Sequence, residues 1–271
     1  MAMTATNSVI AQSPSLDLSK VKAYEHQLED VMEIIDTTIL KTKLKEVEAD
    51  FTQNSSEINK VRLGIIYHET ALNLTFLSKS SYKGYAKKSF DILTVLFESK
   101  TTTKELMPFI ASHRASALSL IGGETKKLGL VGEAFTLFEQ AVNEYSEISY
   151  LPKFLRGSVA ENLPFFFFKK RKFAKLDMQS IIDKQNNNPN YASPKIMSFV
   201  YWAWANQHQS EKYRTESLSY LNKAISFDKN YEGGRKRAED LKAKISMIFC
   251  IKMQAAPASW TTPSNRPGCC S

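Results

Sequence analysis

The stretch that decides the fold spans residues 118–141 and reads LSLIGGETKKLGLVGEAFTLFEQA. Two sets of residues stand in it at helical spacing: Leu118, Ile121 and Gly122, then Ala134, Phe138 and Ala141. Steps of three, four and seven residues place each set on one face of a helix. The small residues let two helix backbones approach closely, and the large ones fill the space between them. The stretch therefore predicts two helices joined by a short turn.

The composition extends this prediction to the whole chain. Hydrophobic residues make up 43% and charged residues 24% of the 271 residues, which is typical of a folded protein. Only ten glycines and nine prolines occur, so long stretches are free of helix breakers. No stretch alternates apolar and polar residues as a strand does, and none is apolar for about 18 residues. We expect an all-α protein without a transmembrane helix.

The chain can be divided into four helix pairs between two further helices. A long N-terminal helix should follow Asp17, either continuing or breaking near Thr37 and Thr38, and a closing helix should span 231–250. The fourth pair repeats the pattern of the second, with Trp204 and Ala205 at the places of Ile121 and Gly122. The predicted pairs are 58–79 with 82–98, 104–122 with 128–146, 153–170 with 172–185, and 193–209 with 211–227.

This pattern of small and large residues resembles the tetratricopeptide repeat, although the spacing of about 41 residues exceeds that family's usual period. A looser likeness links Leu155-Arg156-Gly157 and the residues after it to bacterial tetratricopeptide proteins of unassigned function. The resemblance implies a right-handed α-solenoid of about four helix pairs, with capping helices at both ends, over residues 17–250. It also implies a non-enzymatic scaffold that binds a protein or peptide in its concave groove, without a cofactor.

Carrying the family's groove positions onto this chain predicts a peptide-binding site. Lys126 and Lys127 would favour an acidic peptide, and Trp202 would supply an apolar anchor. The family's set of two lysines and an asparagine that binds a carboxylate is not reproduced here. The predicted peptide-binding residues are Ser119, Lys126, Lys127, Asn162, Trp202, Asn206 and Gln209.

A run of four phenylalanines supports an alternative. Phe165, Phe166, Phe167 and Phe168 precede Lys169, Lys170, Arg171 and Lys172, in a chain whose net charge is +8. Exposed rings beside cations could bind nucleic acid or a membrane surface. We favour a buried helix end instead, because four consecutive rings cover all sides of a helix. Nucleic acid is accordingly a disfavoured partner, and the exposure of Phe165 to Phe168 is the observation that distinguishes this alternative from the scaffold.

The chain offers no evident catalytic or metal site. His26, His68, His113 and His208 are far apart in sequence, and His113 with Ser116 lacks a third partner. Glu161 and Asp177, or Glu25 with Glu29, are expected to be isolated surface carboxylates. No glycine-rich phosphate loop occurs. We therefore predict no enzyme and no metal, and leave any role of Cys269 and Cys270 open.

The terminal segments have a different composition. Residues 1–16 and 251–271 lack apolar periodicity, so both are expected to be disordered. Ser8 to Ser13 resemble the end of a secretory signal peptide, with Val9 and Ala11 at the small-residue positions. We expect a periplasmic or exported protein if residues 3–12 are the remnant of such a signal, and a cytoplasmic one otherwise. The oligomeric state is left open.

Overall fold

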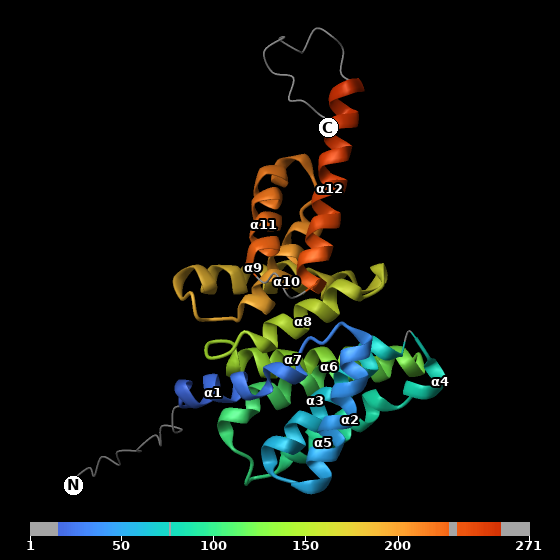
Figure 1. The fold of residues 1–271 in the computed structure, drawn as a ribbon, viewed down its shortest axis with the longest axis vertical. Helices are drawn as coiled ribbons and strands as arrows, with labels where there is room; N and C mark the ends of the chain where they lie inside the picture. The colour runs from blue at the N-terminus through green and yellow to red at the C-terminus, as the bar shows by residue number, and fades with distance from the viewer. Residues whose placement is uncertain (1–15, 76, 228–231, 256–271) are drawn as a thin grey trace, which may run out of the picture. The chain divides into compact units, whose positions relative to one another are not determined.

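A computed structural model describes residues 16–75, 77–227 and 232–255 of the chain. Every regular element in these ranges is helical, which confirms the all-α class (Figure 1). The chain forms two compact units, an N-terminal unit within Met1–Leu137 and a C-terminal unit within Phe138–Ser271. The α-helices are α1 (Leu18–Leu28), α2 (Thr37–Gln53), α3 (Glu57–Leu74), α4 (Lys79–Tyr82), α5 (Tyr85–Glu98), α6 (Met107–Thr125), α7 (Leu128–Tyr145), α8 (Leu151–Asn162), α9 (Phe168–Asn187), α10 (Pro194–Gln207), α11 (Arg214–Phe227) and α12 (Glu232–Ala255).

The first two helices begin at aspartate caps. The Asp17 carboxylate accepts from the backbone N–H groups of Ser19 and Lys20, and Asp36 caps α2 in the same way. Between them lies a short 3₁₀ turn, Glu29–Val31, followed by Glu33 with a φ of 55°. The long N-terminal helix is therefore broken just before Thr37, one of the two outcomes that the sequence left open.

In the N-terminal unit, α3 packs against α2, α5 and α6. A Cβ atom at Gly64 would lie 2.6 Å from Leu93 Cδ2, so α3 and α5 approach closely at this glycine. The Ser89 hydroxyl of α5 donates a 2.7 Å hydrogen bond to the Gly64 carbonyl. Gly122 lets α6 and α7 approach closely, as predicted for the second pair, because a Cβ atom there would lie 2.9 Å from Val131 Cγ2 of α7.

In the C-terminal unit, consecutive helices from α8 to α12 pack against each other in order. The first helices of the third and fourth pairs also touch, because the rings of Phe154 and Phe199 join α8 to α10 with centroids 5.2 Å apart. α10 also contacts the closing helix, α12. Figure 1 shows α10, α11 and α12 side by side. Helices packed in sequential pairs are thus a property of both units.

The turn of the third pair differs from the prediction. It was expected near residues 170–172, but α8 ends at Asn162 and a 3₁₀ turn, Phe165–Phe167, precedes α9. Pro164 explains the shift, since proline has no N–H to continue the helix and restricts the residue before it. The four phenylalanines therefore lie at the start of the second helix of the pair.

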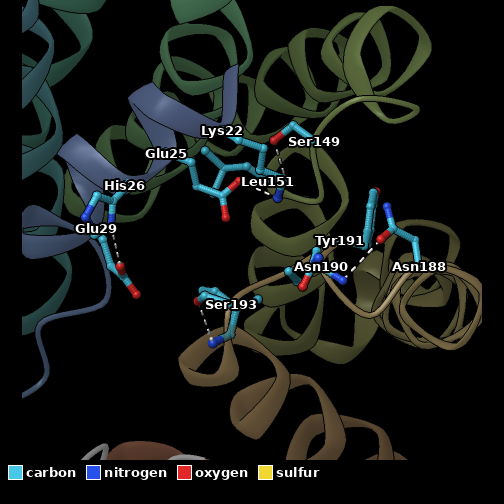
Figure 2. Close-up of polar contacts among 12 residues, drawn as sticks. Lys22, Glu25, His26, Glu29, Ser149, Leu151, Asn188, Asn190, Tyr191 and Ser193 are labelled. Atoms are coloured by element: carbon cyan, nitrogen blue, oxygen red, sulfur yellow. Dashed lines mark hydrogen bonds and ion pairs between the residues drawn. The ribbon is translucent and has the colours of Figure 1, made fainter. Parts of the chain in front are cut away.

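The predicted turn between the third and fourth pairs is built from side-chain hydrogen bonds (Figure 2). The Asn190 N–H donates to Asn188 Oδ1 at 3.1 Å, and the Ile196 N–H donates to Ser193 Oγ at 3.4 Å. The Tyr191 hydroxyl donates to the Ser146 carbonyl at 3.0 Å, which ties the turn to the residue after α7. These bonds fix where α10 begins.

Several expectations fall partly or wholly outside the described residues. They concern the signal-like segment 3–12, the tail beyond residue 255 and the side chains of Cys250, Cys269 and Cys270. Within the described part, α12 continues to Ala255, past the expected end at residue 250. None of the described helices is long and apolar enough to cross a membrane.

Candidate functional sites

The predicted residues of the second pair lie at the end of α6 and in the turn after it. Ser119 is buried and donates a 2.7 Å hydrogen bond to the Ser116 carbonyl, so its hydroxyl is engaged within α6. Lys126 and Lys127 are exposed and form the connection between α6 and α7. Lys126 adopts a left-handed φ of 59° as it ends α6. Of these three residues, only the two lysines are open to a partner.

The Trp202 side chain of α10 is half-buried. It contacts one residue of its own helix and one residue of α12. Its ring lies edge-on to Phe199 with centroids 5.2 Å apart, and the Arg237 guanidinium sits 5.0 Å from the ring centroid. A guanidinium at this distance is attracted to the ring face. Arg237 was missed from the sequence, because the pairing of α10 with α12 brings it here.

The other predicted residues of the C-terminal unit gather where α8 and α10 end. Asn206 donates a 2.8 Å hydrogen bond to Glu161 Oε1, and the Gln209 amide donates to the Asn206 carbonyl at 2.8 Å. Asn162 is exposed and donates to the Ser158 carbonyl at 2.9 Å. The structure thus brings Asn206, Gln209 and Glu161 into one network, with Asn162 next to Glu161 in the chain.

The surroundings of Glu161 in this network shift the pKa of its carboxyl. Burial raises the pKa of its carboxyl above the usual value, and the Asn206 hydrogen bond, the nearby Gln207 amide and the cations Arg237 and Arg171 only partly offset it. Gln207 is close enough to act on Glu161, yet both of its side-chain amide atoms are buried without a hydrogen-bond partner among the described residues. Such an unsatisfied amide costs about 1–3 kcal/mol.

The expectation of isolated surface carboxylates is wrong for Asp177 and Glu25. Asp177 is 2% exposed, and Arg156 donates to its two oxygens at 2.8 and 2.7 Å. Glu25 is 8% exposed and accepts from Lys22 Nζ at 2.7 Å (Figure 2). Both are core residues paired with a cation, which their isolated positions in the sequence did not reveal.

The phenylalanine run is exposed, which corrects the expectation of a buried helix end. The exposed fractions are 84% for Phe165, 51% for Phe166 and 69% for Phe168. The physical reason is the position of the break at Pro164. Phe165, Phe166 and Phe167 form a 3₁₀ turn, and Phe168 is the first residue of α9. The rings therefore do not belong to a helix that neighbours cover on all sides.

Exposed lysines follow these rings along the chain. Lys169, Lys172 and Lys175 are exposed along the first turns of α9, while Arg171 donates to the Leu163 carbonyl. The rings touch each other: Phe165 and Phe166 are 5.7 Å apart, and Phe166 and Phe167 are 4.9 Å apart, between centroids. We call Phe165, Phe166, Phe168, Lys169, Lys172 and Lys175 the Phe/Lys patch.

Two histidines that are distant in sequence meet in the core of the N-terminal unit. His68 of α3 and His113 of α6 are 0% and 1% exposed, and their rings lie edge to face with centroids 5.2 Å apart. His68 Nδ1 lies 3.3 Å from Glu69 Oε1, and His68 Nε2 lies 2.7 Å from the Ser116 hydroxyl. Sequence reasoning missed this cluster because the packing of α3 on α6 creates it.

A serine, a histidine and a carboxylate in contact are also the parts of a nucleophilic relay. Here Ser116 is 3% exposed and Glu69 1%, so no substrate reaches the hydroxyl in this conformation. Burial lowers the pKa of His68 to about 4, and burial together with His68 lowers that of His113 to about 3. Both imidazoles are therefore neutral at pH 7.

Comparison with known proteins found no match. No family model matches the chain. No curated protein matches it. No solved structure matches it. The resemblance to the tetratricopeptide repeat therefore rests on the spacing of residues in this chain alone.

Proposed function

We propose that this protein is a non-enzymatic scaffold whose stacked helix pairs bind a peptide or short helix of a partner protein. The observation that carries the proposal is the contact of α10 with two helices: α8, the first helix of the third pair, and α12, the closing helix. In a right-handed solenoid of tetratricopeptide type, such helices form one continuous binding surface. We call the surface made by α8, α10 and α12 the first-helix face.

The chemistry of this face suits a peptide. The half-buried Trp202 ring, held by Arg237 and Phe199, offers a rigid apolar anchor, and large aromatic groups tend to dominate interface energies. The exposed Lys126 and Lys127 belong to the N-terminal unit, and they would give that unit a preference for acidic sequences.

The test is a peptide array on the full chain, followed by affinity measurements on variants. Trp202→Ala should weaken binding of an array hit by at least tenfold, as expected for an interface anchor. Leu176→Ala is the matched control, because Leu176 is 57% exposed but lies on α9, a second helix. Equal affinity of the wild type and Trp202→Ala would move the site off the first-helix face.

Charge is tested separately. Replacing Lys126 and Lys127 by alanine should lower the affinity for an acidic peptide and flatten its dependence on salt, since salt screens exposed charges. Lys87 is an exposed lysine already paired with Asp91 at 2.6 Å, so Lys87→Ala serves as the control. An unaltered salt dependence in the double variant would remove the two lysines from the site.

The exposure of the Phe/Lys patch favours a second candidate function, binding to an anionic membrane surface. Three exposed rings beside exposed lysines match the aromatic and cationic groups that bind at a lipid interface. Neighbouring rings pack on each other, which leaves no slot for a base to stack between them. This arrangement favours lipid over nucleic acid.

Vesicle sedimentation distinguishes these partners. The full chain should bind vesicles that contain phosphatidylserine, and Phe165→Ser with Phe168→Ser should abolish this binding. Leu128→Ser with Val95→Ser is the control, because both residues are exposed and apolar but lie outside the patch. Salt-sensitive binding to single-stranded DNA, with none to vesicles, would replace the lipid by nucleic acid.

A further inference from the structure

The buried cluster of His68, Glu69 and His113 has the composition of a metal site. One ligand atom from each residue lies within 4.8 Å of the other two, and each side chain is at most 1% exposed. Two imidazoles and one carboxylate form a known ligand set for Zn²⁺. We propose that these three residues bind one divalent transition-metal ion inside the N-terminal unit, a role independent of peptide or lipid binding.

The spacing is close to what a tetrahedral ion requires. With metal–ligand distances near 2.0–2.2 Å, two ligands of a tetrahedral ion stand about 3.3–3.5 Å apart. His68 Nδ1 and Glu69 Oε1 are already 3.3 Å apart. All three ligand atoms lie within 4.8 Å of one another, so side-chain rotation has to shorten any separation by no more than about 1.5 Å to reach that spacing.

The hydrogen bonds around the cluster leave the right nitrogens available. His113 Nδ1 lies 2.9 Å from the Phe109 carbonyl, which can only accept, so Nδ1 carries the proton and Nε2 carries the lone pair. When His68 Nε2 donates to the Ser116 hydroxyl at 2.7 Å, the lone pair of His68 lies on Nδ1, the nitrogen beside Glu69. Metal-binding histidines are held by such second partners.

The carboxylate is oriented in a comparable way. Glu69 Oε2 accepts from the Ile34 N–H and from Asn73 Nδ2, each at 3.3 Å, and Oε1 lies 3.3 Å from His68 Nδ1. The chain thus supplies Glu69 as a third ligand from the same turn of α3 as His68, and the Ser116 hydroxyl as the second partner of His68. With neutral imidazoles and one carboxylate, the ion would keep a single net positive charge.

The experiment uses the full chain with Cys250, Cys269 and Cys270 replaced by serine, so that thiols cannot bind the metal. Because the cluster is buried, the protein is refolded from denaturant with a slight excess of Zn²⁺ and then dialysed. We expect one Zn²⁺ per chain by elemental analysis and a rise in melting temperature over protein refolded with a chelator, since an ion that binds only the folded state stabilises it.

Variants locate the ion. Ser116→Ala should weaken Zn²⁺ binding by about 10–100-fold, as the loss of a second partner does, and Glu69→Gln or His113→Gln should weaken it further. His26→Gln is the control, because the His26 side chain is 87% exposed and lies outside the cluster (Figure 2). Full Zn²⁺ occupancy in Glu69→Gln and His113→Gln would overturn the proposal.

A measurement on the wild-type cluster covers the case in which those variants do not fold. In ¹⁵N-labelled protein, Zn²⁺ should shift the resonances of His68 Nδ1 and His113 Nε2 and leave those of His26 and His208 unchanged. A metal content well below one ion per chain after refolding, or unshifted nitrogens of His68 and His113, would overturn the proposal.

Discussion

At the scale of single residues, the core of the C-terminal unit contains a charged pair that the sequence did not predict. Arg156 binds Asp177 through two hydrogen bonds, and its guanidinium also lies 4.1 Å from the centroid of the Phe173 ring. Burial raises the pKa of Asp177 even though Arg156 opposes it. The carboxylate therefore depends on this arginine to remain charged in the core.

Removing the arginine tests that dependence. We expect Arg156→Met to lower the free energy of unfolding by about 3–5 kcal/mol, because a buried charge loses its partner. Urea unfolding followed by tryptophan fluorescence reports on this unit, since Trp202, Trp204 and Trp260 all follow residue 137. Adding Asp177→Leu should recover part of the loss. If the single variant is as stable as the wild type, the pair contributes nothing to the fold.

At the scale of elements, close helix contacts depend on residues without large side chains. Gly234 of α12 is such a contact, because a Cβ there would lie 2.8 Å from Ser198 Cβ and 3.1 Å from the Ser198 carbonyl carbon of α10. Backbone cannot move aside as a flexible side chain can. The packing of α12 on α10, and with it the placing of Arg237 over Trp202, rests on this glycine.

We therefore expect Gly234→Ala to destabilise the C-terminal unit by about 1–3 kcal/mol, the usual cost of overpacking. Gly132→Ala is the control, since a Cβ there has no neighbour within 4 Å and alanine favours a helix by about 0.5–1 kcal/mol over glycine. Urea unfolding of both variants decides the matter. A stable Gly234→Ala would mean that α12 does not approach α10 so closely.

The register of α7 is tested by overpacking its buried face. Ala134 is 0% exposed, as its predicted place on the small-residue face requires. Ala134→Leu should cost about 1–3 kcal/mol in the free energy of unfolding, measured by circular dichroism. The exposed Thr136, two residues further along the same helix, provides the control Thr136→Leu. Equal melting temperatures of the two variants would show that the assigned face is wrong.

At the scale of the whole molecule, buried histidines make stability depend on pH. The pKa values of His68 and His113 fall to about 4 and about 3 in the folded chain, from 6.5. Below pH 6.5 the unfolded chain therefore binds protons that the folded chain does not. The contribution of these two histidines to the free energy of unfolding is fully present above pH 6.5 and is lost as the pH falls towards 4. Burial raises the pKa of Glu25, which acts in the opposite direction.

We expect thermal stability, measured with a chelator present, to fall between pH 6.5 and 4.5 by at most about 1.4 kcal/mol per pH unit for each histidine. Circular dichroism melts at several pH values measure this slope. His113→Leu should reduce the slope, while His26→Gln should leave it unchanged because His26 is exposed. Identical slopes in the wild type and His113→Leu would show that His113 does not control acid stability.

The amino-acid sequence by itself determined the helical elements and most of their order. Periodic apolar residues and scarce breakers are local properties, so the all-α class, the four helix pairs and the close contact at Gly122 could be read without coordinates. The turn of the third pair was predicted at the wrong place, because the run of Phe and Lys residues after Pro164 was taken as a continuation of the first helix.

Only the tertiary structure decided which side chains are exposed and which meet. The rings of Phe165 and Phe168 are exposed because their neighbours in space do not cover them, and periodicity says nothing about such neighbours. His68 and His113, like Trp202 and Arg237, belong to different helices and come together only when those helices pack. Helical spacing in the sequence tells on which side of its own helix a side chain lies. A site forms only where side chains from several helices point to the same place, and the packing of those helices decides this.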